Sequence, residues 1–355
     1  MRRTVARAGT FPSLARAYTE VSQTVKEQNL LRRTPWFYMA VGVALLLAFG
    51  GAVAGFVLFQ DTWYQLLMAG ALGIIFTQVA FLAHEAAHRQ ILASGPANRR
   101  LARILGGIVG MSYDWWDTKH TRHHANPNQV GRDPDIELDT ISFVEEDAVT
   151  AGRFRALITR KQGWLFFPLL TLEGLNLHWL GIKHLLTARD VPHRWLELGL
   201  IVGRLALVVV PVFLLLPLGM AFAFMGVQLA VFGVYMGASF APNHKGMPII
   251  AHDAKLDFFS KQVRTSRNVR GGWWATWLFG GLNYQIEHHL FPSMSRLHLS
   301  KARRIVQEQC RELDVPYAET SIWRSYAIVV RYLNQVGLAA RDPFDCPMVG
   351  QYRRA

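Results

Sequence analysis

Four long apolar stretches, arranged as two close pairs, constrain the fold of this 355-residue chain more than any other feature. Residues 37–59 carry no charge and would rise about 35 Å as a helix, enough to cross a bilayer's hydrocarbon core of about 30 Å. Residues 63–82 form a second uncharged stretch, after only Gln60-Asp61-Thr62. Residues 195–218 and 220–241 repeat the arrangement. The sequence therefore predicts an all-α integral membrane protein with two transmembrane helical hairpins, which give four spans.

Charge predicts the orientation of these spans. The two hairpin turns contain no Lys or Arg, whereas the segments outside the spans hold nearly all of them. Because cytoplasmic segments are enriched in Lys and Arg, we expect both termini and a helical cap on the cytoplasmic face. This bias also explains much of the net charge of +13, so nucleic acid is not an expected partner, although membrane lipid is.

The chain outside the spans divides by composition and periodicity. Apolar residues at helical spacing, from Leu14 to Val25, predict an amphipathic helix that either lies on the membrane or packs in a core. Residues 299–313 and 321–336 alternate apolar and charged positions with helical spacing and are expected to cap the cytoplasmic side. We expect four units: a basic amphipathic amino-terminal arm (1–36), a membrane domain (37–300), cytoplasmic carboxyl-terminal helices (301–340) and a flexible tail (341–355).

Some polar residues interrupt the apolar stretches. We expect Arg204 to reach the interface along its own apolar stem, with an ion pair to Glu197 as the alternative. Residues 102–110 are apolar but too short to cross a bilayer, and residues 164–182 are borderline in length and contain polar side chains. Both segments are predicted to be helices that lie on the membrane surface or enter it partly.

Three short clusters contain seven of the thirteen histidines. They are His84-Glu85-Ala86-Ala87-His88, His120-Thr121-Arg122-His123-His124 and Gln285-Ile286-Glu287-His288-His289. Residues three and four apart share one face of a helix, so each cluster can direct its imidazoles toward one point. Neutral imidazole suits iron, copper, nickel and zinc, and this number of ligands exceeds what one tetrahedral ion needs. The clusters therefore predict two metal ions, for which two irons fit best.

A single His-x-x-x-His pair is often a surface or core pair, so the argument depends on the three clusters together. The predicted topology brings all of them to the cytoplasmic side, where they can share one site. Asn243-His244 follows the fourth span at the same level, which makes His244 the best candidate for an eighth imidazole. The remaining histidines lack this arrangement. His178, His184, His193 and His298 are expected at the interface or outside the ligand set, and the role of His252 stays ambiguous.

The order of the clusters, the stretch from Phe279 to Pro292 and the Asn243-His244 pair resemble the membrane fatty acid desaturase family. The resemblance covers about residues 35–300 and implies a four-span helical protein with two irons at the cytoplasmic face. Gln285 stands where many members have His, and it resembles the front-end members, which insert a double bond toward the carboxyl end. The implied iron ligands are His84, His88, His120, His123, His124, His244, His288 and His289.

Desaturation removes hydrogen from unactivated methylenes, which needs an oxygen-derived oxidant and a supply of electrons, with O2 as co-substrate. Four carboxylates near the clusters are candidates to orient the ligands or to remain solvated: Glu85, Glu287, Asp114 and Asp117. Gln285 and Asn243 are candidates for outer or weak ligands. Aromatic residues could form an apolar acyl channel or belong to the interfacial belt: Tyr113, Trp115, Trp116, Trp273, Trp274 and Trp277.

We therefore expect an oxygen-dependent desaturase that introduces a cis double bond into an acyl-CoA or an acyl-lipid. Front-end relatives usually carry a cytochrome b5 module with a His-Pro-Gly-Gly motif, which does not occur in this sequence. A separate electron donor is expected, either ferredoxin-type or cytochrome b5-type with its reductase. Two alternatives remain: a lipid or carotenoid hydroxylase or ketolase with the same metals, and a metal-binding transporter or receptor. The second alternative predicts ionisable residues deep in the spans, of which Arg204 is the clear case.

Overall fold

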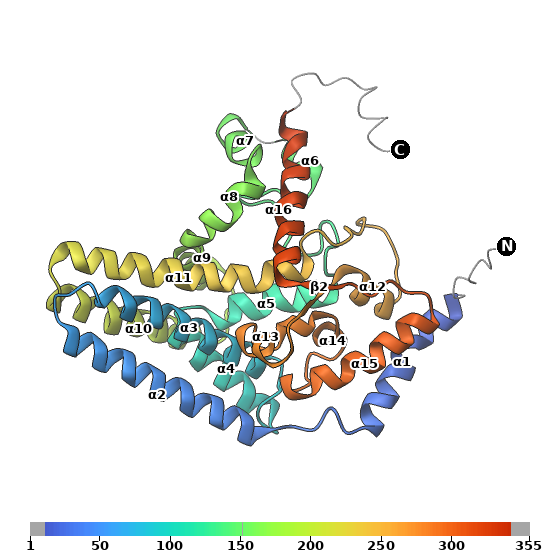
Figure 1. Cartoon of the computed structure of the whole chain (residues 1–355), viewed down its shortest axis with the longest axis horizontal. Coiled ribbons are helices and arrows are strands. Elements are labelled where there is room, and N and C mark those ends of the chain that lie inside the picture. Colours follow the sequence, from blue (N-terminus) through green and yellow to red (C-terminus); the bar gives the residue numbers. More distant parts are fainter. Residues whose placement is uncertain (1–10, 151, 342–355) are drawn as a thin grey trace.

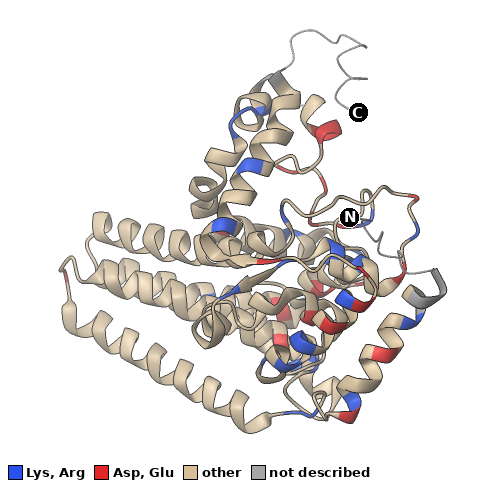
Figure 2. Ribbon diagram, turned by 45° about the vertical axis from the view of Figure 1, so that its right-hand side comes forward, with Lys and Arg blue, Asp and Glu red and all other residues tan. Residues whose placement is uncertain are grey.

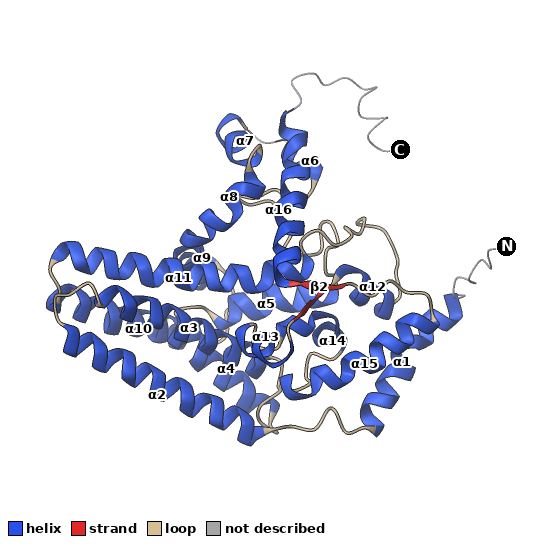
Figure 3. Cartoon of the chain, viewed as in Figure 1, coloured by secondary structure: helices blue, strands red, loops and turns tan. Residues whose placement is uncertain are grey.

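The computed structural model describes residues 11–150 and 152–341. Within them, helices dominate and one short two-stranded sheet forms (Figure 3). The α-helices are α1 (Phe11–Glu27), α2 (Pro35–Phe59), α3 (Gln65–Ala87), α4 (Gly95–Val109), α5 (Tyr113–Ala125), α6 (Glu145–Val149), α7 (Arg153–Thr159), α8 (Gln162–Leu169), α9 (Glu173–Thr187), α10 (Arg194–Leu215), α11 (Leu218–His244), α12 (Phe258–Thr265), α13 (Gly272–Leu278), α14 (Gln285–Leu290), α15 (Arg296–Glu312) and α16 (Ile322–Leu338). The 3₁₀ helices are η1 (Leu170–Leu172), η2 (Leu282–Tyr284) and η3 (Ala339–Arg341), and the strands are β1 (Asn268–Arg270) and β2 (Glu319–Ser321).

Four long helices, α2, α3, α10 and α11, lie side by side, with their connecting turns at one end of the molecule (Figure 1). The first pair turns between Phe59 and Gln65, and the second pair turns at Leu216-Pro217. Leu216 is extended (φ −112°, ψ 148°), because the ring of Pro217 disfavours the helical conformation of the residue before it. The helices of both predicted hairpins are therefore present, and the protein is a mostly helical membrane protein in which five apolar helices are long enough to cross a bilayer.

A fifth apolar segment, residues 162–187, is also long enough to cross a membrane by length and composition. It consists of α8, η1 and α9, and it runs across the direction of the four long helices in Figure 1. Its close contact with α11 depends on two glycines. A Cβ on Gly233 would meet the Leu170 carbonyl at 2.4 Å, and one on Gly174 would meet the Leu229 carbonyl at 2.6 Å. Small residues at such crossings let helix backbones approach closely.

At the other end of the bundle, α1, α5 and α12–α15 form a cap (Figure 1). The buried face of α1, with Ala17, Val21 and Val25, packs in one apolar core with residues such as Phe259 and Val306 from α12 and α15. Of the two alternatives for this helix, core packing is confirmed. The predicted helices at 299–313 and 321–336 correspond to α15 and α16. The predicted tail lies outside the described residues after Arg341.

Both predictions for Arg204 are wrong. The side chain is buried, its Nε donates to the Ile108 carbonyl at 3.2 Å, and its guanidinium carbon lies 4.2 Å from the centre of the Phe76 ring. Glu197 instead accepts from Arg103 Nε at 2.9 Å. The reason is α4, which packs between α3 and α10 and supplies both a free carbonyl at its carboxyl-terminal end and the competing Arg103.

The strands β1 and β2 pair in parallel, with Val269 opposite Thr320 (Figure 3). They were not predicted, because three-residue strands leave no alternating pattern to detect. The pairing holds the segment after α12 against the segment before α16. It places Asn268 Nδ2 2.6 Å from the Tyr317 hydroxyl, and Asn268 Oδ1 accepts from the backbone N–H of Ile286 in α14 at 2.9 Å.

Candidate metal centre

Four elements bring the eight predicted imidazoles together in the cap side of the bundle. The carboxyl-terminal end of α3 supplies the first cluster, α5 the second, α14 the third, and the last residue of α11 is His244. The ring centres of His88 and His289 lie 4.7 Å and 4.2 Å from that of His124, so the three sequence clusters share one site. The eight form two groups: His84, His88, His120, His124 and His288 in the first, and His123, His244 and His289 in the second.

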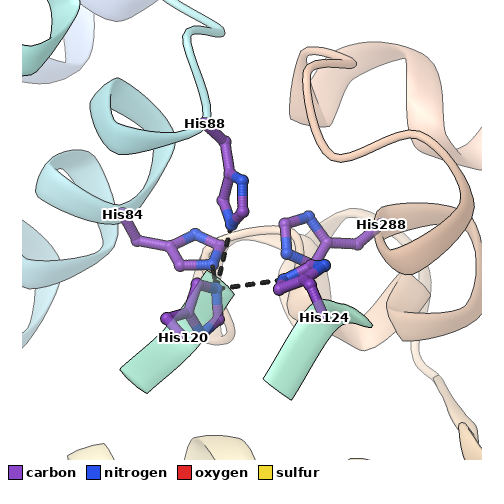
Figure 4. A group of neighbouring side chains, drawn as sticks. All are labelled: His84, His88, His120, His124 and His288. Carbon is purple, nitrogen blue, oxygen red and sulfur yellow. Dashed lines mark hydrogen bonds between the residues drawn. The ribbon is translucent and has the colours of Figure 1, made fainter. Parts of the chain in front are cut away.

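In the first group, drawn in Figure 4, His120 occupies the centre. Its Nε2 lies 3.1, 2.9 and 3.0 Å from the Nε2 atoms of His84, His88 and His124. One ring nitrogen can carry one proton or one lone pair, so at most one of these three contacts is a good hydrogen bond. The Nε2 of His288 is buried without a protein partner. A cation among these nitrogens would satisfy all of them.

In the second group, the outer hydrogen bonds determine the tautomers. The Nδ1 atoms of His123, His244 and His289 face the Asp133 carboxylate at 3.0 Å, the Thr265 carbonyl at 2.9 Å and the Gln262 Oε1 at 2.9 Å. These acceptors require a proton on Nδ1, so each neutral ring has its lone pair on Nε2.

These lone pairs converge. His244 Nε2 lies 3.3 Å from His123 Nε2 and 3.1 Å from His289 Nε2. Three unshared lone pairs at this separation repel one another unless a cation lies between them. The residues present therefore fit a metal ion in each group.

Burial keeps most of these rings in the neutral form that binds metal. Burial lowers the pKa of five imidazoles well below the usual value, and the neighbouring imidazoles lower it further. These five are His88, His120, His124, His288 and His289. His123 differs: burial opposes its charged form, but the Asp135 and Asp133 carboxylates raise its pKa overall.

Gln285 and Asn243 lie beside the second group. Gln285 Nε2 is 2.9 Å from His244 Nε2, and Asn243 Nδ2 donates to Gln285 Oε1 at 3.1 Å. Both side chains are buried. The structure thus brings Gln285 into the same cluster as the imidazoles of the second group.

The four carboxylates predicted to orient the ligands have other partners. Glu85 accepts from Arg296 and Tyr38, and Glu287 accepts from Asn268 and Tyr317. Asp114 contacts His184 at 2.9 Å, and Asp117 bonds to Tyr113. The prediction that these groups accept the second ring proton of the ligands is wrong.

The groups that do accept those protons were missed. They are Asp133, Gln262 and the backbone carbonyl of Thr265. Asp133 also accepts from the backbone N–H groups of Asn128 at 2.7 Å and Asp135 at 2.9 Å, so the loop after α5 holds it rigidly. These residues lie ten or more positions from their partners, where helical spacing gives no signal.

An apolar cavity adjoins the first group, and two predicted aromatic residues, Tyr113 and Trp116, line it. Trp116 stacks on His120, with ring centres 4.3 Å apart. The lining consists of Ala80, Ala83, His84, Ala102, Gly106, Val109, Met111, Ser112, Tyr113, Trp116, Met236 and Phe240.

The other predicted channel residues lie elsewhere. Trp115 lies outside this lining, with the Lys119 ammonium 5.9 Å from its ring centre. Trp273, Trp274 and Trp277 are 77, 44 and 45% exposed, because the short helix α13 buries Ala275 instead. These three residues therefore do not line this cavity, and their position agrees with the alternative of an interfacial belt.

A family model of fatty acid desaturases matches residues 61–321, which is most of the chain. The chain belongs to the fatty acid desaturase family. Among curated relatives, a Delta(8)-fatty-acid desaturase of Helianthus annuus is 29% identical over 86% of this chain and 69% of its own length. The Delta(6)-fatty-acid desaturase fat-3 of Caenorhabditis elegans is 27% identical over 91% and 75%. An acyl-lipid (9-3)-desaturase of Borago officinalis is 26% identical over 84% and 69%. The protein is therefore an acyl desaturase, an oxidoreductase of lipid metabolism.

Replacing Asp133 with Asn tests the outer shell of this desaturase. An amide has one acceptor oxygen where the carboxylate has two, so in either orientation one of the backbone N–H groups of Asn128 and Asp135 faces its NH2 group, and His123 loses its orienting carboxylate. Removal of such partners typically lowers metal affinity 10- to 100-fold. We expect about this loss in affinity for the iron of the second group, measured by titration with a chelator. Asp139→Asn, an exposed change in the same loop, should have no effect. Equal iron retention in both variants would contradict the assignment.

Proposed function

We propose that this desaturase binds two iron ions, one in each imidazole group, and uses O2 to introduce a cis double bond into an acyl chain. Convergence of eight imidazoles into two adjoining groups is the observation that carries the proposal. Imidazole-rich sites suit iron, and no side-chain acid or base can activate a methylene C–H bond. When bound, the iron pair supplies the oxygen-derived oxidant for that step.

The remaining residues of the chain hold the substrate and the ligands. The cavity beside His84 and Trp116 suits the methylenes of an acyl chain, because its lining is mostly apolar and adjoins the first group. Gln285 acts as a weak or outer ligand of the second ion, held in place by Asn243. If both amides make a half-turn, the Gln285 oxygen faces a cation and its nitrogen donates to Asn243 Oδ1, which has no partner in the present arrangement.

The overall reaction requires an external reductant. Loss of one hydrogen from each of two neighbouring methylenes releases two electrons and two protons, while reduction of O2 to two waters consumes four of each. A separate electron donor, of ferredoxin or cytochrome b5 type with its reductase, supplies the other two electrons, and solvent supplies two protons. The substrate is an acyl-CoA or an acyl-lipid.

The position of the double bond is proposed to lie toward the carboxyl end of the acyl chain. Gln285 in the third cluster supports this, as do relatives named Delta(8) and Delta(6) desaturases and acyl-lipid (9-3)-desaturase. Gain of a bond at the methyl-end side in product analysis would contradict it.

In the membrane, we propose four spans, α2, α3, α10 and α11, with the cap and both termini on the cytoplasmic side. Lys and Arg gather away from the hairpin turns (Figure 2), in line with the positive-inside rule. Residues 162–187 lie at the interface, because they contain Glu173 and are the least apolar of the five candidate helices.

The test is expression in a host that lacks the activity, followed by mass spectrometry of its fatty acids. We expect a product that has lost two hydrogens, and about two irons per chain in the purified protein. A product that has gained one oxygen would instead identify a hydroxylase. The absence of both iron and product would overturn the proposal.

A further inference from the structure

The short helix α12 lies between the imidazole groups and the surface of the cap, and it contacts both groups. The Gln262 side chain is fully buried, accepts from His289 Nδ1 at 2.9 Å and donates to the His124 carbonyl at 2.9 Å. One side chain thus joins a residue of the first group to a residue of the second. Thr265, at the end of α12, accepts from His244.

The outer side of α12 carries cations without partners of opposite charge. Lys261 and Arg264, three residues apart, share a helix face, and partial burial, together with the charge of Arg132, lowers the pKa of Lys261. Among the described residues, no carboxylate forms an ion pair with Lys261, Arg264 or Arg132, and the Lys261 ammonium donates to the Ala125 carbonyl at 3.3 Å. Phe258, 43% exposed, adds an apolar element beside them. We call Arg132, Phe258, Lys261 and Arg264 the α12 face.

Other cations near the site either form ion pairs or lie beside the apolar cavity. Lys119 pairs with Asp135 at 3.1 Å. Arg89 and Arg99 approach each other over Gly95 and act on Asp117, whose partner Tyr113 lines the apolar cavity. That second basic region therefore belongs to the substrate side of the site. None of the four residues of the α12 face lines the cavity, and α12 contacts the ligands through Gln262 and Thr265.

We propose that the α12 face is the docking surface for the electron donor, a one-electron carrier protein with an acidic surface. The proposal rests on the proposed function, since each turnover needs two external electrons delivered to buried ions. Complementary charge raises the rate of encounter and orients the partner, and an apolar residue among cations suits a brief contact. From the docked donor, the backbone and side chain of Gln262 give a short bonded path to His289 and His124.

The experiment compares a double variant, Lys261→Glu with Arg264→Glu, with the full-length wild-type protein. The donor is a purified acidic ferredoxin or cytochrome b5 that supports wild-type turnover. We expect the KM for the donor to rise about tenfold or more at low ionic strength, because steering becomes repulsion. The KM for the acyl substrate and the iron content should not change. Salt should slow the wild type but not the variant.

The matched control is Lys301→Glu with Arg304→Glu, the same charge change at exposed positions of α15. An equal rise in donor KM in both double variants would overturn the proposal, as would a rise in the KM for the acyl substrate instead. A single turnover separates the two proposals: the iron-loaded protein is reduced by dithionite without O2, the excess dithionite is removed because it would consume O2, and O2 and the acyl substrate are then added. If dithionite supports product formation in the wild type and in both variants, the proposed function stands and the donor KM decides the docking surface. If it supports none in the iron-loaded wild type, the proposed function fails.

Discussion

Replacing His120 with alanine should abolish desaturation and remove iron from the first imidazole group. His120 Nε2 is the atom on which the group converges, within 3.1 Å of three other Nε2 atoms. Loss of an outer partner of a ligand typically costs 10- to 100-fold in affinity or activity, so loss of a central ligand should cost more than about 100-fold. Iron per chain and product formation in the purified protein measure both effects.

The control for this variant is His252→Ala, because His252 is exposed and belongs to neither group. It should keep its iron and its activity. A change in the environment of Trp116 is a further readout, because this indole stacks on His120 and loses that contact when the imidazole is removed. A His120→Ala protein that folds and retains two irons would contradict this prediction and show that His120 is not needed to hold iron in the first group.

The sequence predicted the hairpins and the ligand arms because both depend on local patterns. An uncharged stretch of more than about 20 residues has few alternatives to a membrane-spanning helix. Histidines three or four apart, such as His84 and His88, share one face whenever their segment is helical. His244 could be located because the end of a span sets its depth in the membrane.

The outer partners of the ligands could not be predicted in the same way. Glu85 and Glu287 follow or precede a ligand directly in the sequence, but neighbouring residues point about 100° apart on a helix. Each carboxylate is therefore directed away from the metals, toward Arg296 or toward Asn268. The true partners, such as Gln262, approach from another element, so their positions depend on tertiary packing. The exposed tryptophans of α13 were misassigned for the same reason.

Replacing Arg296 with methionine should destabilise the protein by about 3–5 kcal/mol, the usual cost of leaving one charge of a buried pair alone. Arg296 Nε donates to Glu85 Oε1 at 2.5 Å, and its Nη2 donates to Glu85 Oε2. The two side chains are only 2 and 1% exposed. This bidentate pair joins the end of α3 to the start of α15, with the Tyr38 hydroxyl also donating to Glu85.

The expected readout is a lower thermal midpoint of the iron-loaded protein in detergent, with iron lost only as the protein unfolds. In this the variant differs from His120→Ala, which loses iron from a folded chain. The double variant Glu85→Gln with Arg296→Met should recover part of the stability, because no uncompensated charge remains in the interior. Arg311→Met breaks an exposed pair with Glu308 and should cost less than about 1 kcal/mol. If Arg296→Met and Arg311→Met shifted the midpoint equally, the buried pair would not be what fastens the first histidine cluster to the cap.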